Sequence, residues 1–381
     1  MAESPHAGMR ASGHASMRVR RGARRRESPA RPQSKFLSCP ETCFMMERRE
    51  CGRAGHRARR TAGMPPCGHT RTQDLMNLER SMQQANQQGV VIAVGNQKGG
   101  VGKTTNTVHI AAALGQRGFH CLIMDLDPAA GATKHLGVPV NSFAGTLELL
   151  TTDETVESLA IADNMPPNVH LVPSRPQLSE IDNLVSKYVD RTRILERPTE
   201  EARKKYDFIF LDTGPSAAFT TTVSAYSTAE WFLLSAFPHP LSLGGLTEAF
   251  NDIADVRKHR NPGLEVLGVV FTNVDGRATR LRAQLEAVVN KALPGRRFDT
   301  SISQAVILPD ASGRGKTLFQ LPKFEDIPVA MQYIRLSIEV EHRVRHRETF
   351  LQGALDALPF AIYGLDAFEV ERPPQALAAN E

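Results

Sequence analysis

The sequence lacks any long hydrophobic run: nowhere do apolar residues continue for the roughly 18 to 20 positions that cross a bilayer. This argues against a transmembrane helix. Cysteine is also scarce, with 5 in 381 residues, and only Cys121 lies beyond residue 67. A single cysteine among apolar neighbours fits the reducing cytoplasm. Aromatic residues make up only 6%, but the hydrophobic content of 41% is ordinary for a soluble protein with a substantial core.

Positive charge is concentrated at the N-terminal end. The formal net charge is +5, but residues 1–88 carry 17 Lys and Arg against 7 Asp and Glu, whereas the remainder carries 29 against 34. The first segment has no sustained apolar period and is rich in Arg, Ala, Gly, Ser and Pro. We therefore expect residues 1–88 to form a disordered, Arg-rich extension. It has no 7–15-residue apolar core of the kind found in secretory signals.

Three interpretations of this extension remain open. Translation could begin later, at one of three internal methionines, or the segment could be an inert tail. It could also be a basic arm that contacts nucleic acid. A small metal site is the third possibility, although the cysteine spacing fits no common zinc pattern. The methionines are Met64, Met76 and Met82, and the possible ligands are Cys39, Cys43, Cys51 and His56.

A strand, a glycine-rich turn and the start of a helix follow one another between Val90 and Thr105. The apolar run Val90–Val94 is typical of a buried strand, and apolar residues after Thr105 recur with helical spacing. This order is the context of a phosphate-binding loop, in which backbone N–H groups close around a phosphate. Three residues without a Cβ atom allow that close approach: Gly99, Gly100 and Gly102.

The residues that open the helix carry the chemistry that a nucleotide needs. Lys103 would bring positive charge to the β- and γ-phosphates, and the Thr104 hydroxyl would ligate Mg²⁺. Gln97 stands where the strict phosphate-loop pattern has its first glycine, and a second lysine, Lys98, precedes the glycines. A glycine-rich turn with nearby lysines is the alternative interpretation.

Eight consecutive residues, 98–105, resemble the deviant Walker A motif of the ParA/MinD family of dimerising ATPases. The resemblance extends over residues 90–345 and implies a P-loop NTPase fold, ATP and Mg²⁺ as ligands, and a homodimer that forms with ATP. It also implies that Lys98 acts catalytically across the dimer. The loop residues that it assigns to the nucleotide are Gly99, Gly100, Val101, Gly102, Lys103, Thr104 and Thr105.

Beyond the loop the chain alternates strand and helix patterns. This alternation predicts an α/β fold with a mostly parallel twisted sheet and helices on both faces. We expect a P-loop ATPase domain over residues 89–350 and an acidic tail over residues 351–381. Residues 140–205 carry no chemical motif; they predict a short strand at Val169–Ser174, a helix over Leu178–Leu195, and a surface elaboration.

Two apolar strand patterns end in carboxylates. Asp125 and Asp127 close one, and Asp212 closes the other. In open α/β sheets, ligands bind beyond the C-terminal ends of the strands, where these side chains would lie. By resemblance, Asp127 orients or activates the attacking water, Asp125 supports it and the metal shell, and Asp212 is the Walker B residue that reaches Mg²⁺ through water. The alternatives are a turn-capping aspartate and a structural strand end. Gly214 departs from the Asp-x-Pro-Pro usual in the family, so the response of that loop to the γ-phosphate stays open.

Two later positions are expected near the adenine. The resemblance carries base recognition to Asn273, at the end of a strand pattern over Leu264–Thr272, and less strongly to Pro309 and its neighbour Asp310. A side chain that only satisfies the turn is the alternative role of Asn273.

Two branches of this family are disfavoured because the sequence lacks the residues that they need. An iron–sulfur branch needs cysteines in the ATPase region, and a membrane-bound branch needs a basic amphipathic C-terminal helix. Residues 354–381 hold five acidic residues and one basic residue, Arg372, so anionic lipid would repel them. A cytoplasmic, nucleoid-associated ATPase for plasmid or chromosome partition remains, working with non-specific DNA and a centromere-binding, ParB-like partner, without a membrane.

Two other functions stay open: a ParA-like ATPase that positions other cargo or regulates without DNA, and an ordinary P-loop kinase, against which Lys98 argues. For partition, phosphate contacts need a positive face. The candidates for DNA contact are Arg257, Lys258, Arg280 and Arg282, and a further basic group is Arg343, Arg345 and Arg347. Each group could equally be an ordinary solvated helix face.

Overall fold

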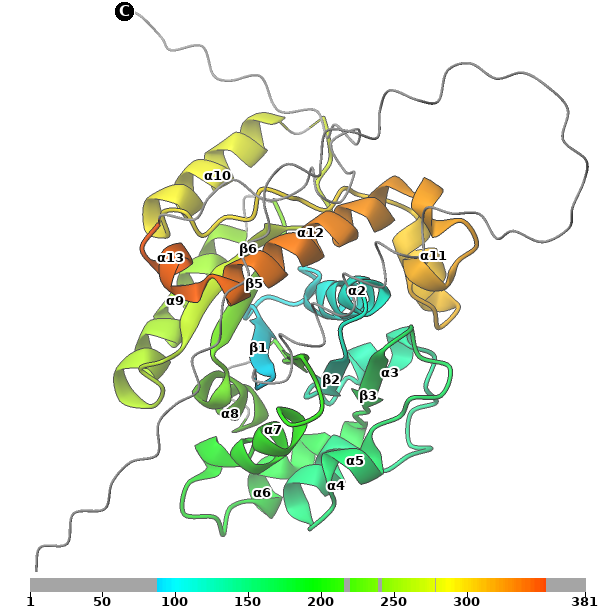
Figure 1. Ribbon diagram of the computed structural model, residues 1–381. Coiled ribbons are helices and arrows are strands. Elements are labelled where there is room, and N and C mark those ends of the chain that lie inside the picture. The colour runs from blue at the N-terminus through cyan, green and yellow to red at the C-terminus, as the bar shows by residue number, and fades with distance from the viewer. Residues whose placement is uncertain (1–87, 216–219, 239–241, 278, 354–381) are drawn as a thin grey trace, which may run out of the picture. The chain divides into compact units, whose positions relative to one another are not determined.

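The computed structural model describes residues 88–215, 220–238, 242–277 and 279–353 (Figure 1). The expected N-terminal extension and residues 354–381 of the expected acidic tail lie outside this part of the chain. Within it, no helix combines the length and the apolar character that a bilayer crossing requires.

Six parallel strands form one sheet in the order β3-β2-β4-β1-β5-β6. The predicted α/β fold is therefore confirmed. Each strand is a near-continuous apolar run, because helices cover both faces of the sheet. The strands are β1 (Val90–Gly95), β2 (Cys121–Asp125), β3 (Val169–Val172), β4 (Phe208–Asp212), β5 (Trp231–Ala236) and β6 (Glu265–Phe271).

The register places the predicted functional residues at one edge. β1 lies between β4 and β5, and Val94 pairs with both Asp212 and Leu233. Asp125 at the end of β2 pairs with Asp212. The strand order reverses at β1, because β2 and β3 lie on one side of it and β5 and β6 on the other. In such sheets this reversal point is where ligands bind.

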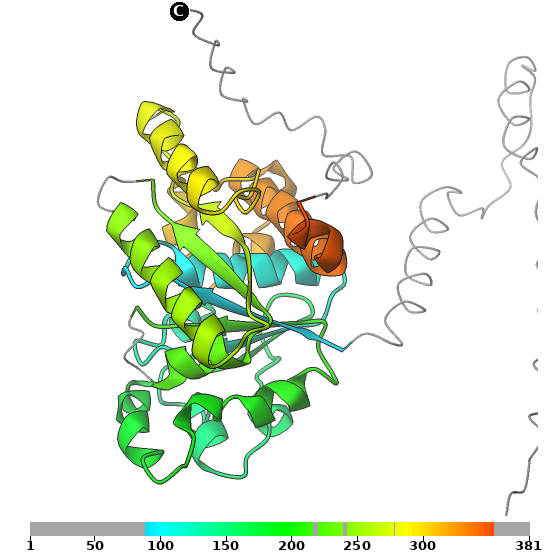
Figure 2. The same cartoon turned by 90° about the vertical axis from the view of Figure 1, so that its left-hand side faces the viewer.

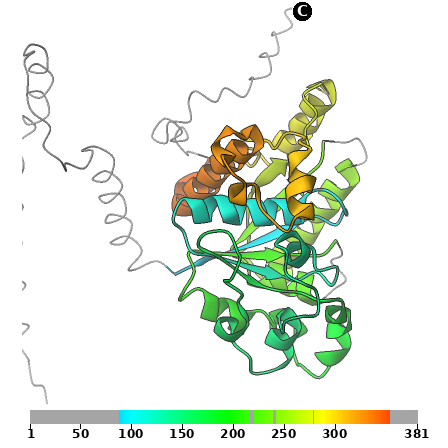
Figure 3. The ribbon, with the colours of Figure 1, turned by 90° about the vertical axis from the view of Figure 1, so that its right-hand side faces the viewer.

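One face of the sheet is covered by α2 and α12, which pack against each other (Figures 1 and 3). Ile92 and Val94 of β1 point to this face, where the core also holds Phe210, Trp231 and Tyr333. The helices on this side are α2 (Lys103–Gln116), α3 (Gly131–His135), α11 (Ile307–Gly313), α12 (Pro328–Arg345) and α13 (Arg347–Leu351).

The opposite face, toward which Val91 and Ala93 point, is covered by four short helices, α4 to α7, and by the longer α8, α9 and α10 (Figure 2). They are α4 (Thr146–Thr151), α5 (Val156–Leu159), α6 (Ile181–Leu184), α7 (Glu196–Ala202), α8 (Thr220–Thr228), α9 (Ser242–His259) and α10 (Thr279–Ala292). Short 3₁₀ turns complete the described chain at η1 (Pro176–Glu180), η2 (Arg191–Arg193), η3 (Leu318–Gln320) and η4 (Phe324–Asp326).

Two expectations for residues 140–205 are wrong. The segment is not a surface elaboration, because Leu149, Leu178 and Leu195 are buried in the core of this face. The helix expected over Leu178–Leu195 is replaced by η1, α6, turns and η2. Each short piece places a few apolar side chains on the sheet, so the periodicity of one long helix is absent. The short strand expected at Val169 is β3.

Candidate functional site

The loop between β1 and α2 has the backbone of an anion cradle. Gly100 and Gly102 adopt φ values of 75° and 86°, in the left-handed region that favours glycine. A Cβ atom placed on Gly99 or Gly100 would meet nothing within 4 Å, so the space over the loop is open. The first-turn N–H groups of α2 adjoin this space, as a phosphate site requires.

Lys103 lies along the loop with its charge partly withdrawn from water. The residue is 7% exposed, and its Nζ donates to the carbonyl oxygen of Lys98 at 3.1 Å. Burial lowers the pKa of Lys103, and the carboxylates of Asp212 and Asp127 oppose that change. A fully charged anion in the loop would therefore attract this ammonium group more strongly than the single carbonyl oxygen does.

Thr104 and Asp212 meet at the end of β4. The Thr104 Oγ1 donates to Asp212 Oδ2 at 2.8 Å, and the Thr107 Oγ1 donates to Asp212 Oδ1 at 2.9 Å. Burial, together with the nearby Asp125, raises the pKa of Asp212 to about 7. A buried carboxylate beside a second one is stabilised by a cation, and a hydroxyl and a carboxylate suit Mg²⁺ that also binds phosphate oxygens. These residues thus fit the expected metal.

Asp125 is occupied by the protein itself. Its Oδ2 accepts from the backbone N–H of Thr133 at 2.9 Å and from the Thr133 hydroxyl at 2.7 Å, and its Oδ1 accepts from the Asp127 N–H at 3.2 Å. Burial raises its pKa to about 6. Asp125 therefore fixes the path of residues 125–133, and its supporting role for Asp127 stays a prediction with this geometric basis.

Asp127 stands at the front of the site. It is half-buried, its Oδ1 accepts from the Ala129 N–H at 2.8 Å, and its carboxylate faces Gly214. A Cβ atom on Gly214 would lie 3.5 Å from the carboxyl carbon, in ordinary contact. The two loops that follow β2 and β4 are thus neighbours, as a group that positions water near a γ-phosphate requires.

Lys98 sits on a loop that is tied to two other elements. Asn96 accepts from the Lys98 N–H at 2.9 Å and donates to the Ser235 carbonyl at 2.8 Å, and Gln97 donates to Asp252 of α9. Lys98 itself is half-buried and forms no ion pair with any described residue. Its ammonium group is therefore available to a ligand or to a partner subunit.

A cavity of about 320 Å³ adjoins the loop and brings several predicted residues together. It is lined by Gly100, Val101, Gly102 and Thr105 on one side, and by Asn273 and Pro309 on another. Asn273 lies in the turn after β6 with φ 55°, and Pro309 comes from α11. Other lining residues could not be recognised from the sequence because no local motif marks them; they include His135, Phe237, Thr272 and Tyr333.

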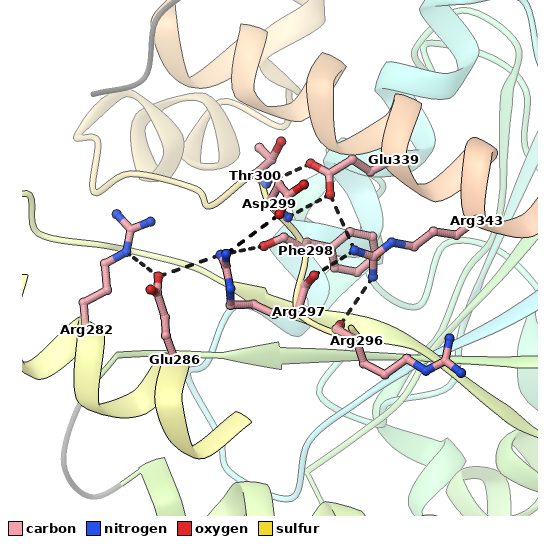
Figure 4. Close-up of polar contacts among 9 residues, drawn as sticks. All are labelled: Arg282, Glu286, Arg296, Arg297, Phe298, Asp299, Thr300, Glu339 and Arg343. Carbon is pink, nitrogen blue, oxygen red and sulfur yellow. Dashed lines mark hydrogen bonds and ion pairs between the residues drawn. The ribbon is translucent and has the colours of Figure 1, made fainter. Parts of the chain in front are cut away.

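The basic candidates for DNA contact differ in how free their charges are. Arg257 forms two hydrogen bonds to Glu265, at 2.7 and 3.0 Å. Arg282 pairs with Glu286 at 2.8 Å, as Figure 4 shows. Lys258 and Arg280 are exposed and form no ion pair within the described part of the chain. The role of all four residues in DNA binding stays a prediction.

The expectation that Arg343 belongs to a solvated or DNA-binding group is wrong. Its side chain is buried, and its guanidinium donates to three backbone carbonyls, of Leu267, Arg296 and Arg297 (Figure 4). It also lies 4.0 Å from the centre of the Phe298 ring. Arg343 therefore ties α12 to β6 and to the segment at Arg296 and Arg297, which pairs with the edge of β6.

Several known proteins are similar to this chain in sequence. The family model described as AAA domain matches residues 89–266. The chain is 35% identical to the chromosome-partitioning ATPase Soj of Thermus thermophilus, over 67% of this chain and 96% of that protein. It is 31% identical to the sporulation initiation inhibitor protein Soj of Bacillus subtilis, over 60% of this chain and 90% of that protein.

A solved structure shares the fold. The septum site-determining protein MinD of Pyrococcus horikoshii, complexed with Mg-ADP, has a TM-score of 0.54 at 22% identity and covers 68% of this chain and 98% of its own. Taken with the two relatives and the site geometry, these similarities give the identity of the chain: it belongs to the ParA/Soj family of P-loop ATPases.

Proposed function

We propose that this protein is an ATP-driven dimer switch for plasmid or chromosome partition. It binds Mg²⁺ and ATP, dimerises, holds duplex DNA without sequence preference, and is released when a ParB-like partner stimulates slow hydrolysis. The observation that carries the proposal is the cluster at the sheet edge, where Lys103, Thr104 and Asp212 adjoin the half-buried Asp127. One relative is named a chromosome-partitioning ATPase and both are named Soj, which supports DNA as the cargo.

In this proposal each residue of the cluster has one task. Lys103 leaves the Lys98 carbonyl and neutralises phosphate charge, while the N–H groups around Gly100 and Gly102 orient the phosphates. Thr104 and Asp212 would hold Mg²⁺, which supplies charge stabilisation to the transferred phosphoryl group. Asp127 orients the attacking water, and Lys98 reaches the nucleotide of the partner subunit as an arginine finger does.

DNA binding would use the exposed cations, and dimerisation would double them. Lys258 near the end of α9 and Arg280 near the start of α10 are the candidates with free charge. A cytoplasmic, nucleoid-associated protein follows from this assignment. The alternative is a ParA-like ATPase that positions other cargo without DNA, and its distinguishing property is ATP-dependent dimerisation without duplex binding.

The test measures anisotropy of a labelled duplex with the full-length protein, with ATP or ADP, between about 50 and 200 mM salt. We expect binding only with ATP and a steep loss with salt. Replacing Lys258 and Arg280 by Gln removes two cations from each subunit, so it should reduce the salt slope of the dimer by about 4, since each phosphate contact contributes about 1. The matched control replaces two exposed cations elsewhere, Arg191 and Lys204, by Gln. Dimerisation without DNA binding at low salt would favour the alternative.

A further inference from the structure

His135 ends α3 and lies against the cavity beside the P-loop. The residue is only 5% exposed, yet it is one of the side chains that line the space between Thr105, Asn273 and Pro309. No motif assigns it a role. Its position matters because this space runs from the phosphate loop to the turn after β6.

The other polar groups around His135 are satisfied within the protein. His109 donates from Nδ1 to the Thr105 carbonyl at 2.9 Å and accepts at Nε2 from the Leu318 N–H at 3.3 Å. The Tyr333 hydroxyl donates to Asn106 Oδ1 at 3.0 Å. The ring of His109 stacks on that of Tyr333, with 4.8 Å between the ring centroids. It meets the ring of His135 edge to face, with 5.1 Å between the centroids.

His135 is the exception in this group. Its Nε2 is buried and has no hydrogen-bond partner among the described residues. Burial lowers its pKa to about 4, so the ring is neutral near pH 7. A buried polar atom without a partner destabilises the folded state, and such atoms in native structures call for an explanation. No hydrogen bond to a described residue fixes the ring, so a half-turn about χ2 can exchange the positions of its nitrogen and carbon atoms.

We propose that His135 hydrogen-bonds the nucleoside half of the bound nucleotide, at a ribose hydroxyl or at the edge of the base. The proposal rests on the proposed function, which places ATP in this cavity. A neutral imidazole carries one donor and one acceptor, which match a hydroxyl or a base edge. It has no charge with which to attract phosphate, and Lys103 and the loop N–H groups already serve that purpose. His135 is therefore a specificity residue for nucleoside over bare phosphate.

The experiment uses the full-length protein and measures two ligands by titration calorimetry, Mg-ATP and Mg-bound inorganic triphosphate. His135→Leu should weaken ATP binding about tenfold, or about 1.4 kcal/mol, and leave triphosphate binding unchanged. The melting temperature of the ligand-free variant should stay level or rise, since an unpaired polar atom has been removed. His135→Gln keeps hydrogen-bonding groups and should recover part of the ATP affinity.

The matched control is His170→Leu, on β3. The His170 ring bonds the Tyr206 hydroxyl at 2.8 Å, so this variant should melt lower without losing ATP affinity. Dideoxy-ATP identifies the partner: wild type and His135→Leu should bind it equally if the ribose is contacted, and should still differ tenfold if the base is contacted.

Two results would overturn the inference. One is wild-type ATP affinity in His135→Leu. The other is an equal loss of ATP and triphosphate affinity together with a lower melting temperature, which is the signature of a purely structural histidine. If the wild-type protein binds neither ligand, the proposed function fails instead, so the two failures are distinguishable.

Discussion

Asp212 is the residue at which stability and function should conflict most clearly. Its carboxylate is fully buried beside Asp125, and both pKa values are raised, that of Asp212 to about 7 and that of Asp125 to about 6. In the unfolded chain an aspartate titrates near 3.9. The folded state therefore holds a proton that the unfolded state has released. Stability is lost as the pH rises from about 4 to about 7 and is then level.

The magnitude follows from the shift. A rise of about three pKa units corresponds to about 4 kcal/mol of destabilisation at high pH, and about 2 to 3 kcal/mol of it appears between pH 5 and pH 8. Asp212→Asn keeps the shape and an acceptor for Thr104 or Thr107, but it removes the charge. We expect this variant to be more stable than wild type at pH 8 by about 4 kcal/mol, because it carries no buried charge. It should also lose Mg²⁺-dependent ATP binding.

The assay is urea unfolding of ligand-free protein at pH 5 and pH 8, with Asp163→Asn as an exposed matched control. The difference between wild type and Asp212→Asn in the pH dependence of the unfolding free energy gives the contribution of this one carboxylate. His109 acts in the opposite direction, because burial lowers its pKa to about 3 and its contribution is lost as the pH falls below about 6.5. If Asp212→Asn is several kcal/mol less stable than wild type at pH 8, then the carboxylate is a stabilising ionic partner of Lys103 and the reasoning is refuted.

Three further variants separate binding, contact across the dimer, and hydrolysis. Lys103→Ala leaves phosphate charge uncompensated and should abolish ATP binding in calorimetry; wild-type affinity would contradict the P-loop assignment. Lys98→Ala should bind ATP but not hydrolyse it, because its ammonium group makes no ion pair in the described chain and is assigned to the partner's nucleotide. Normal phosphate release per subunit would rule out that role. Asp127→Ala should bind ATP and stay dimeric by light scattering, since it acts on water and not on affinity; an ATP-bound monomer would count against it.

Residues close in sequence could be predicted well. The strand over Val90–Gly95, the glycine turn and the helix start are all encoded within one contiguous stretch, and the structure has them in that order. The apolar runs that end at Asp125 and Asp212 likewise predicted strands whose C-terminal ends meet at one edge of a parallel sheet. Strand patterns and the rules of parallel sheets suffice for this, because both are local or general.

Contacts between distant segments could not be predicted. Arg343 was grouped with surface cations, but its guanidinium binds carbonyls on residues 267, 296 and 297. The charges of Arg257 and Arg282 are offset by Glu265 and Glu286, a pairing that only the helix positions reveal. Residues 140–205 looked polar, yet their sparse leucines are buried in the core on one face of the sheet.

The sequence by itself therefore determined the fold class, the family and the phosphate-binding chemistry of this protein, because each depends on short patterns whose geometry is nearly invariant. The tertiary structure alone decided which charges are free, which helices form the core, and that His135 lines the cavity while its Nε2 has no partner among the described residues. Burial and hydrogen-bond pairing are properties of neighbours brought together by folding, and neither has a signature in the local sequence.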